Sequence, residues 1–490
     1  MRGIGLIGLA GVVLGGCFLA GSEVGGSDGL PADPMAEAAR RLRPLDPPPL
    51  VRLVTLDPGH FHAYLVQKRM LEGVSPEVAV YAPQGAELEA HLDAIRQFNS
   101  RSDSPTRWNE RVFAGETYLE RCLREKRGNT LVLAGDNSRK ADYILQGVKA
   151  GFNIHTDKPI ALNRDAYAKL TNAMAIAREK GLILRDIMTE RYEITTILQG
   201  LLARFPEVYG EQLKGTPEHP AVTKESVHHF CKSVAGKPLR RPAWYYDVTR
   251  QGEGIVDVTT HLVDLVQYEL FPGAALQPAD VHLIHAAKWP TRITRDQYRK
   301  STGLDDFPLA LDPVRTPGRD AIDVMANGEF TYTLRGIHAK ISVVWDFEPP
   351  EGGGDTHYSC LRGSKATLLI RQGKVENYRP ELYVLPTGKV PADETRRCLE
   401  KALRAINQRY PGVAMKPTPE GYQILIPETY RNGHEAHFAQ ATEQFIRYLR
   451  AGTMPQWECD FMRTKYYTLV QAKALADAAP ATRPTPPKTK

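Results

Sequence analysis

Short apolar runs alternate with amphipathic segments from residue 51 to residue 187, and this alternation constrains the fold more than any other feature of the chain. The predicted strands cover residues 51–56, 78–81, 130–134, 152–155 and 182–187. The predicted helices cover residues 63–71, 87–98, 118–126, 140–150 and 164–180. Such alternation is typical of a parallel sheet with helices on both faces. Residues 50–187 therefore predict a Rossmann-type, doubly wound domain, with residues 99–109 as an inserted polar loop.

The pattern changes after about residue 190. Residues 328–349 and 357–373 alternate apolar and polar side chains, as a half-exposed antiparallel sheet does. Two helical patterns, at residues 436–451 and 461–478, close the chain. We therefore expect an α/β protein in which residues 188–478 form an α+β domain with an open, mainly antiparallel sheet. Residues 479–490 predict a disordered tail.

The N-terminus has the features of an export signal. Arg2 precedes an apolar run, Ile4–Leu14, that is too short to span a bilayer. The run ends in Leu-Gly-Gly-Cys17, which resembles the lipobox of bacterial lipoproteins. The resemblance implies cleavage after residue 16, lipidation of Cys17, a tether over residues 18–49 and attachment to a membrane surface at the periplasmic face. The alternative is a glycine-rich signal with an incidental cysteine.

Composition excludes some classes of protein. The net charge is only +6 over 490 residues, and no basic stripe with interleaved aromatics occurs, so nucleic acid is not an expected partner. The five cysteines after Cys17 form no Cys-x-x-Cys pair, so neither a zinc knuckle nor a disulfide framework is expected.

Two motifs carry residues suited to proton and hydride chemistry. Asp157-Lys158-Pro159 follows the strand predicted at residues 152–155, and Pro159 fixes the turn so that Lys158 projects where open α/β sheets bind ligands. Asp257 and His261 lie four residues apart, which on a helix suits a general base oriented by a carboxylate. The alternatives are a surface turn and the solvated face of a helix.

Together with Arg191-Tyr192 at the crossover into the second domain, these motifs resemble the Gfo/Idh/MocA family (glucose-fructose oxidoreductase, inositol dehydrogenase and MocA-type proteins). Family members carry Glu-Lys-Pro, Arg-Phe and Asp-x-x-x-His at the corresponding places. The likeness covers residues 50 to about 475, and "DPGHFHA", "DKPIAL" and "GEGIVDVTTHLVDL" resemble the branch with its own oxidoreductase C-terminal domain.

The resemblance implies an oxidoreductase that uses NAD or NADP and acts on a hydroxyl of a sugar, polyol or glycoside. His261 would take the hydroxyl proton, Asp257 would orient His261, and Lys158 would stabilise the developing alkoxide. A small carbohydrate is the expected partner, and the exposed face of the open sheet is a plausible surface for homo-oligomer formation.

Further residues are predicted to bind the substrate. Aromatic rings pack against the apolar face of a pyranose, which favours the sequence "AWYY" for this role. His228 and His229 lie in a predicted strand and so point to opposite faces, which allows at most one of them to face the site. The predicted substrate residues are Arg191, His229, Trp244, Tyr245, Tyr246 and Asp264; for the three aromatic residues the alternative is a place in the core or at the domain interface.

The loop after the first strand reads Asp57-Pro58-Gly59-His60-Phe61-His62 and has one glycine where dinucleotide loops usually have three. We expect Gly59 and the amides after it to hold the pyrophosphate at the start of the following helix. The second strand ends in Tyr81-Ala82-Pro83 without an acid, which leaves NAD versus NADP open. The predicted cofactor residues are Pro58, Gly59, His60, Phe61, His62, Tyr81, Asp136, Asn137, Asp157, Lys158 and Pro159.

Because nicotinamide cofactors are made in the cytoplasm, an exported enzyme predicts a tightly held, recycled cofactor. One alternative is redox-assisted glycoside cleavage through a transient keto sugar, and another is a non-catalytic glycan-binding lipoprotein. A third is a metal-dependent hydrolase that uses His60 and His62, with His155, His228 and His261 as later ligands. The antiparallel pattern of the second half disfavours that fold, and "HEAH" at residues 434–437 is one residue short of the zinc motif and predicts a helix start, so no metal is expected.

Overall fold

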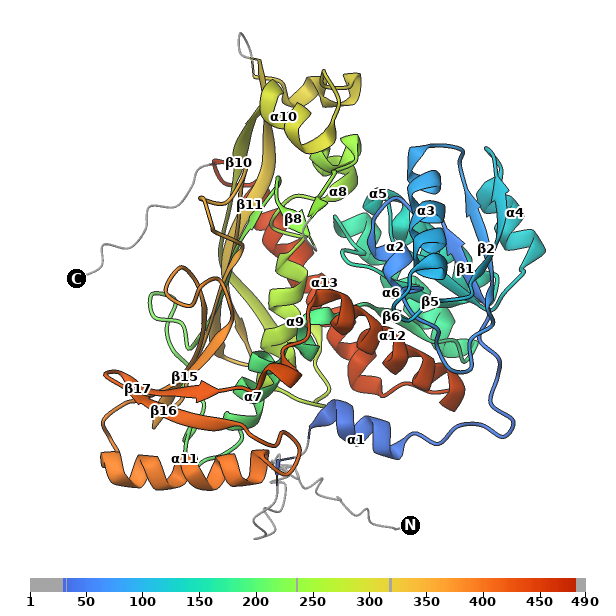
Figure 1. Cartoon of the computed structure of the whole chain (residues 1–490). Coiled ribbons are helices and arrows are strands. Elements are labelled where there is room, and N and C mark those ends of the chain that lie inside the picture. The colour runs from blue at the N-terminus through green and yellow to red at the C-terminus, as the bar shows by residue number, and fades with distance from the viewer. Residues whose placement is uncertain (1–29, 32, 235–236, 317–319, 482–490) are drawn as a thin grey trace, which may run out of the picture.

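The computed structural model describes residues 30–31, 33–234, 237–316 and 320–481. The signal segment and Cys17 lie outside the described residues. Two sheets organise the chain, and in Figure 1 the N-terminal one is blue to teal and the C-terminal one runs from green to orange.

The first sheet has six parallel strands in the order β3-β2-β1-β4-β5-β6. Its strands are β1 (Leu53–Leu56), β2 (Glu77–Ala82), β3 (Asn109–Ala114), β4 (Thr130–Leu133), β5 (Asn153–Thr156) and β6 (Leu184–Asp186). The helices that connect them are α2 (His62–Leu65), α3 (Ala86–Ser100), α4 (Tyr118–Glu125), α5 (Asn137–Lys149) and α6 (Arg164–Glu179). The strand order reverses between β1 and β4, which is the place where Rossmann-type sheets bind ligands. The predicted Rossmann-type fold is confirmed.

Two details of this domain differ from the prediction. β3 was not predicted: the expected loop ends at residue 109, and residues 110–114 were assigned to no element. The side chains of β3 are at least partly exposed and form no buried run. α2 has four residues where a helix over residues 63–71 was expected. The inserted segment accounts for the short helix: the indole N–H of Trp108 donates to the carbonyl of Gln67 (2.6 Å), and Arg101 donates to the carbonyl of Lys68 (2.6 Å).

The second sheet has nine strands in the order β10-β11-β12-β7-β13-β14-β15-β17-β16. All neighbours are antiparallel except β7 and β12, which are parallel. The strands are β7 (Val222–His229), β10 (Val281–Thr294), β11 (Ala321–Leu334), β12 (Ile337–Asp346), β13 (Thr356–Arg362), β14 (Ala366–Gln372), β15 (Glu381–Pro386), β16 (Ala414–Thr418) and β17 (Gly421–Leu425). A short pair, β8 (Ser233–Val234) and β9 (Lys237–Pro238), stands apart. The predicted open, mainly antiparallel sheet is confirmed.

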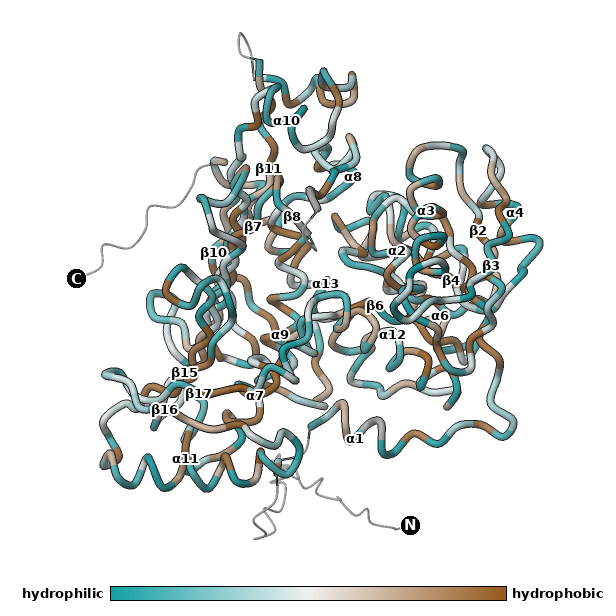
Figure 2. Tube along the Cα trace, in the orientation of Figure 1, coloured by the Kyte–Doolittle hydropathy of each residue, from teal (hydrophilic) through white to brown (hydrophobic). Residues whose placement is uncertain are grey.

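Helices of the second half lie beside this sheet and between the two lobes (Figure 1). They are α7 (Ile194–Leu202), α8 (Val248–Gln251), α9 (Thr259–Leu270), α10 (Arg295–Thr302), α11 (Ala392–Ile406), α12 (His434–Ala451) and α13 (Gln456–Asp477). Short 3-10 turns are η1 (Thr189–Tyr192), η2 (Ala243–Tyr246), η3 (Pro278–Asp280), η4 (Leu309–Val314) and η5 (Glu428–Tyr430). Hydrophobic segments follow the strands inside both lobes (Figure 2).

The C-terminal helix α12 completes the core of the first domain. Phe438, Ala441 and Phe445 are at most 1% exposed and share one hydrophobic cluster with Leu53 of β1 and Val78 of β2. In Figure 1, α12 accordingly lies between the N-terminal sheet and the rest of the second half. One helix of the predicted second domain, α12, therefore packs as part of the first domain.

The described part of the predicted tether is not simply extended. Residues 34–41 form a helix, α1 (Pro34–Arg41), which runs below both lobes in Figure 1. Met35 is buried in the main core, Asp33 pairs with Arg409 of the second domain (2.7 Å), and the amide of Leu45 donates to the carbonyl of Arg450. The segment before residue 50 is therefore packed onto the C-terminal half.

Two further observations bear on the class of protein. Within the described residues, no helix is long and apolar enough to cross a membrane. Cys122, Cys231, Cys360, Cys398 and Cys459 are all free, with Cys122 and Cys360 buried.

Candidate active site

A cavity of about 710 Å³ lies between the Rossmann-type domain and the second sheet. Its walls come from the loop after β1, the carboxyl end of β5, the start of α9, strands β7 and β13, and the start of α12. The site residues predicted from the sequence that line it are His60, Phe61, His62, Asn137, Asp157, Lys158, Tyr245, Asp257 and His261. The structure thus brings together residues that are 200 positions apart, as the family resemblance predicts.

Lys158 and Asp257 form an ion pair across the domain boundary. The Lys158 ammonium lies 2.7 Å from Oδ1 of Asp257, and both side chains are at most 11% exposed. Oδ2 of Asp257 accepts a hydrogen bond from Gln251 (3.1 Å). Asp257 therefore fixes Lys158, and the prediction that it orients His261 is wrong. The reason is local: α9 begins at Thr259, so Asp257 precedes the helix and the four-residue spacing does not place the two side chains on one helical face.

His261 lies in the first turn of α9 and is 8% exposed. Its Nδ1 has no hydrogen-bond partner among the described residues. Burial, reinforced by the positive charge of Lys158, holds the pKa of His261 well below its usual value. The imidazole is therefore neutral at physiological pH and has a free lone pair, which is what a general base requires.

His60, His62 and Asp157 form a second cluster on the floor of the cavity. The Nδ1–H of His62 donates to Oδ2 of Asp157 (2.8 Å), and Nδ1 of His60 lies 3.6 Å from the same oxygen. Nε2 of His62 lies 3.1 Å from Nε2 of His434, the first residue of α12. Burial acts to raise the pKa of Asp157, but the neighbouring His62 and Lys140 hold that pKa well below the usual range, so Asp157 is ionised.

The first amides of the loop after β1 are already engaged. The N–H groups of Gly59 and His60 both donate to the carbonyl of Ala134 (3.1 Å each). Asp57, at the place of the first loop glycine, adopts a left-handed backbone (φ 50°). A side chain at Gly135 would lie 2.3 Å from the carbonyl oxygen of Asp57, so the two loops touch directly. The expectation that Gly59 and the amides after it hold the pyrophosphate stays a prediction, and the helix that follows the loop, α2, has only four residues.

A smaller hollow of about 150 Å³ adjoins this loop at the point where the strand order reverses. Pro58, Gly59, Asp136, Arg139 and Arg250 are among its walls. Arg250 pairs with Asp136 (2.8 Å), and Arg139 lies 3.7 Å from Asp57.

Segment 243–251 of the second domain covers this hollow. The Trp244 ring lies 3.5 Å from the position that a side chain at Gly59 would take, and the Asn137 amide donates to the carbonyl of Gln251 (2.7 Å). Trp244 was predicted to bind substrate but lines the hollow beside the loop and not the large cavity.

Several other predicted site residues are structural. Tyr81 is fully buried and donates to Glu125, and Tyr246 is stacked on Phe230 in the core. Both rings lie on the core side of their backbone, which the sequence pattern does not reveal. Pro159, which was also predicted to bind the cofactor, packs near Gly252.

Arg191 and Asp264, predicted to bind substrate, form a buried ion network instead. Arg191 makes two hydrogen bonds to Asp264 (2.6 and 2.7 Å) and one to Glu458 (2.8 Å), and Lys465 lies 2.8 Å from Asp264. All four side chains are at most 4% exposed. The network ties η1 at the domain crossover to α9 and α13.

His228 lines the cavity, whereas His229, which was predicted to bind substrate, does not. Both histidines contact Asp355, at 3.3 Å from His228 and 2.8 Å from His229. His155, a ligand in the hydrolase hypothesis, is buried against Phe445 outside the cavity.

The cavity also contains residues that the sequence analysis did not single out. Burial, with the nearby charge of Glu193, raises the pKa of Glu190 to about 7. Other cavity residues not predicted as site residues are Lys232, Arg241, Gln251, Asp355, His357, Arg379, Arg431 and His434. Most come from loops and strand ends of the second domain, where no motif marks them. Glu190, next to the Arg-Tyr crossover motif, and His434, in the "HEAH" sequence, had a signal nearby.

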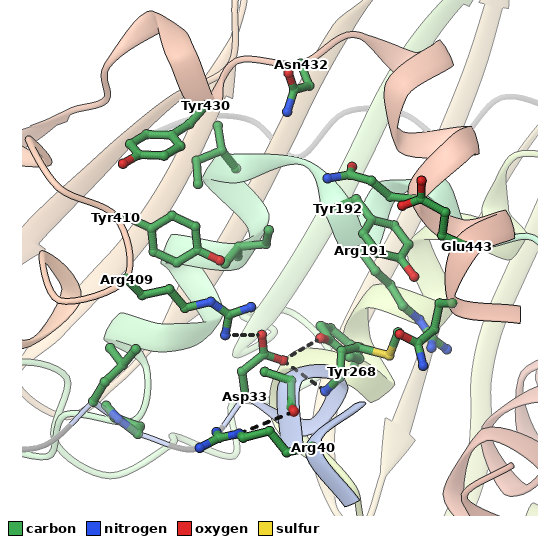
Figure 3. A pocket seen from close by; sticks show the side chains of 18 of the residues that line it. Asp33, Arg40, Arg191, Tyr192, Tyr268, Arg409, Tyr410, Tyr430, Asn432 and Glu443 are labelled. Atoms are coloured by element: carbon green, nitrogen blue, oxygen red, sulfur yellow. Dashed lines mark hydrogen bonds and ion pairs between the residues drawn. The ribbon is translucent and has the colours of Figure 1, made fainter. Parts of the chain in front are cut away.

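A third cavity, of about 850 Å³, lies beside α1 (Figure 3). Asp33 projects between Arg409 and Tyr268 there, and dashed lines in Figure 3 mark both contacts. Asp33 and Arg409 of its walls therefore already pair with each other, and none of the residues predicted for catalysis lines this cavity.

These observations define a class: a two-domain oxidoreductase in which a Rossmann-type sheet and an open-sheet domain enclose a cavity with a lysine and a neutral histidine. Residues 198–477 match the family model "Putative oxidoreductase C terminal domain". The chain belongs to this family of oxidoreductases.

Three solved structures are similar to this chain. "A putative oxidoreductase" from Parabacteroides merdae is 49% identical, with a TM-score of 0.86 over 88% of this chain and 98% of that chain. KijD10, a 3-ketoreductase from Actinomadura kijaniata solved with NADP and TDP-benzene, is 14% identical, with a TM-score of 0.51 over 86% of this chain and 96% of that chain. GenD2 from gentamicin A biosynthesis, solved with NAD, is 15% identical, with a TM-score of 0.51 over 87% and 94%. The last two show similarity of fold alone. No curated protein sequence matched the chain.

Proposed function

We propose that the protein is an NAD- or NADP-dependent oxidoreductase that acts on a hydroxyl group of a sugar, polyol or glycoside. The observation that carries this proposal is the meeting of Lys158 and neutral His261 in one cavity at the carboxyl ends of a Rossmann-type sheet. KijD10 and GenD2 share this fold and were solved with NADP and NAD.

The crevice between β1 and β4 suits a dinucleotide with one change from the usual pattern. The amides of Gly59 and His60 are occupied, so the pyrophosphate would be held by the guanidinium groups of Arg139 and Arg250, which line the hollow beside the loop. Guanidinium groups bind phosphate oxygens in a bidentate manner. Asn137 and Lys158, at the adjoining wall of the large cavity, would face the nicotinamide side.

When bound, the nicotinamide accepts or returns a hydride. His261 would take the proton of the substrate hydroxyl, because its imidazole is neutral and the residue lines the cavity. The Lys158 ammonium, held by Asp257, stabilises the negative charge that develops on the substrate oxygen. Tyr245 and His228 line the same cavity and would contact the sugar.

The cover of segment 243–251 over the hollow supports a cofactor that is retained and recycled. Release would require the Arg250–Asp136 ion pair and the contact between Asn137 and Gln251 to open. Retention of the cofactor suits an exported protein.

We propose that the protein has a lipid anchor at Cys17 and lies at the periplasmic face of the membrane. We also propose that its substrate is a carbohydrate and that it assembles into a homo-oligomer. Redox-assisted glycoside cleavage would use the same cavity residues and is the second candidate function.

The cofactor proposal is tested by denaturing purified protein and measuring released nicotinamide dinucleotide by absorbance and mass. About one NAD(H) or NADP(H) per chain is expected. No released cofactor, together with no thermal stabilisation by added NAD or NADP, would overturn the proposal.

The catalytic roles are tested by Lys158→Ala and His261→Ala in a screen of sugar and glycoside oxidation. Each change is expected to lower kcat by about 10²- to 10³-fold, the usual effect of removing one group that acts in the transition state. Undiminished turnover in both variants would remove the mechanism. His357→Gln, at another wall of the same cavity, is the matched control.

A further inference from the structure

We propose that His60, His62 and Asp157 form a binding site for one divalent transition-metal ion, with zinc the preferred occupant, on the floor of the large cavity. One ligand atom from each residue can be chosen so that all three lie within 4.8 Å of one another. Two histidines and a carboxylate form a common set for zinc and for other first-row metals.

The distances suit a shared ion. Oδ2 of Asp157 lies 2.8 Å from Nδ1 of His62 and 3.6 Å from Nδ1 of His60. Ligand atoms about 2.0–2.2 Å from one zinc ion stand roughly 3–3.5 Å apart, so movements of a few tenths of an ångström along the His62–Asp157 and His60–Asp157 edges would admit the ion. Nδ1 of His60 accepts a long hydrogen bond from the backbone N–H of His62 (3.4 Å), so it is the unprotonated nitrogen of that ring, and binding the ion would replace this contact.

His434 is placed to orient His62. Metal-bound histidines usually donate their other ring N–H to a neighbouring acceptor. The Nε2 of His62 lies 3.1 Å from Nε2 of His434, within hydrogen-bonding distance. Binding of the ion through Nδ1 of His62 would place the ring proton on Nε2, where it can be donated to His434.

Nearby positive charges are already engaged. Lys158 pairs with Asp257, and Lys140 donates to Asn137 and to the backbone oxygen of Asp157. These partners reduce the repulsion that a divalent cation would meet, although the two lysines still weaken its binding. The ligands themselves stand on the turn after β1 and at the end of β5, two places fixed by the parallel sheet.

Three protein ligands leave at least one position for another molecule, and the trio faces the cavity that contains Lys158 and His261. Oxygen donors suit that position, so the ion would bind a hydroxyl or carbonyl oxygen of a polyhydroxylated substrate. The metal site stands independently of the nicotinamide proposal, because its ligands are identified by their own geometry.

The test uses full-length purified protein. The protein is stripped with a chelator and dialysed, zinc chloride is added, and bound zinc is measured by elemental analysis and by competition with a chromophoric chelator. Cobalt(II) chloride supplies a second readout, since its visible spectrum reports nitrogen and oxygen ligands. We expect one ion per chain and an increase in Tm on zinc addition.

His60→Gln and Asp157→Asn are expected to weaken zinc binding at least about 100-fold, and His434→Ala about 10-fold, the usual effect of losing an orienting partner. His228→Gln, a histidine of the same cavity outside the trio, should bind zinc as the unaltered protein does. Circular dichroism confirms that each variant is folded.

Absence of a stoichiometric ion in the unaltered protein, or equal binding in folded His60→Gln and Asp157→Asn variants, would overturn the metal site. In either case the trio is a hydrogen-bonded cluster only. The cofactor measurement is made on the same sample. Bound zinc, with neither released nicotinamide dinucleotide nor thermal stabilisation by added NAD or NADP, supports the metal site and contradicts the proposed function. Nicotinamide dinucleotide without zinc supports the proposed function and contradicts the metal site.

Discussion

Asp264 was predicted to bind substrate, but in the structure it holds a buried ion network together. Its carboxylate is 1% exposed and holds both Arg191 and Lys465. From the sequence it was a polar residue one turn beyond His261, equally suited to binding a sugar. Only the structure shows that two cations from distant segments converge on it.

Replacing Asp264 by alanine should therefore destabilise the protein. The change leaves Arg191 and Lys465 buried with incomplete partners, and breaking a buried pair costs about 3–5 kcal/mol. The free energy of unfolding, measured with urea, checks this. Asp296→Ala, in an exposed pair with Arg299, should cost less than about 1 kcal/mol. Equal stability of Asp264→Ala and the unaltered protein would contradict the network's structural role.

Glu190 makes the stability depend on pH. Burial raises its pKa from 4.5 to about 7, so the folded protein binds the proton more tightly than the unfolded chain. Protonation of Glu190 contributes fully to the free energy of unfolding below about pH 4.5. This contribution, on the order of 1–3 kcal/mol, is lost as the pH rises through 7. Urea unfolding from pH 4.5 to 8 should show this decline in the unaltered protein and less of it in Glu190→Gln.

Exposed Glu351→Gln is the control for Glu190 and should keep the decline. If Glu190→Gln shows the same pH dependence as the unaltered protein, the carboxyl does not titrate in this range.

At the scale of elements, most strands and helices of the Rossmann-type domain with buried apolar faces were predicted within a few residues, whereas α7, α11 and β10 of the second domain were not predicted. β1 and β4 are runs of four residues, every one of them buried, and α6 follows an amphipathic pattern that begins at an Asn163 cap. The short α2 was not predicted, because its length depends on contacts of Trp108 and Arg101 with the segment that follows it. β3 was not predicted either, because its partly exposed side chains form no buried run and its pairing with β2 defines it. The site follows the same rule. Lys158 and His261 could be predicted because they lie in sequence motifs. The pairing of Asp257 with Lys158 could not, because it depends on where α9 starts.

Gly254 sets that start by close packing. An added side-chain carbon there would lie 1.8 Å from the carbonyl oxygen of Ala326 in β11. Gly254→Ala should therefore displace the segment before α9 and cost about 1–3 kcal/mol or more, measured by thermal unfolding. Gly373→Ala, whose added carbon meets only the end of the flexible Glu376 side chain at 3.5 Å, should change Tm little. Similar Tm values for the two variants would show that β11 can move away from residue 254 without loss of stability, which would contradict the prediction.

At the scale of the whole molecule, the sequence predicted two consecutive domains, but the core of the first is completed by α12. A fragment of residues 50–187 alone would expose the surface that Phe438, Ala441 and Phe445 cover. We expect it to bind a hydrophobic dye and to unfold without a cooperative transition, unlike the full chain. Adding a peptide of residues 434–452 should restore part of the cooperativity. Cooperative unfolding of the fragment by itself would contradict this.

The return of α12 to the first domain also governs the order in which the polypeptide can acquire its native structure. Residues 50–187 leave the ribosome about 250 residues before α12 does. The N-terminal sheet must therefore wait, partly assembled, until the last tenth of the chain emerges. We therefore expect the native core to be completed only when synthesis is nearly finished, which leaves the apolar surface of the incomplete N-terminal sheet open to chaperones until then.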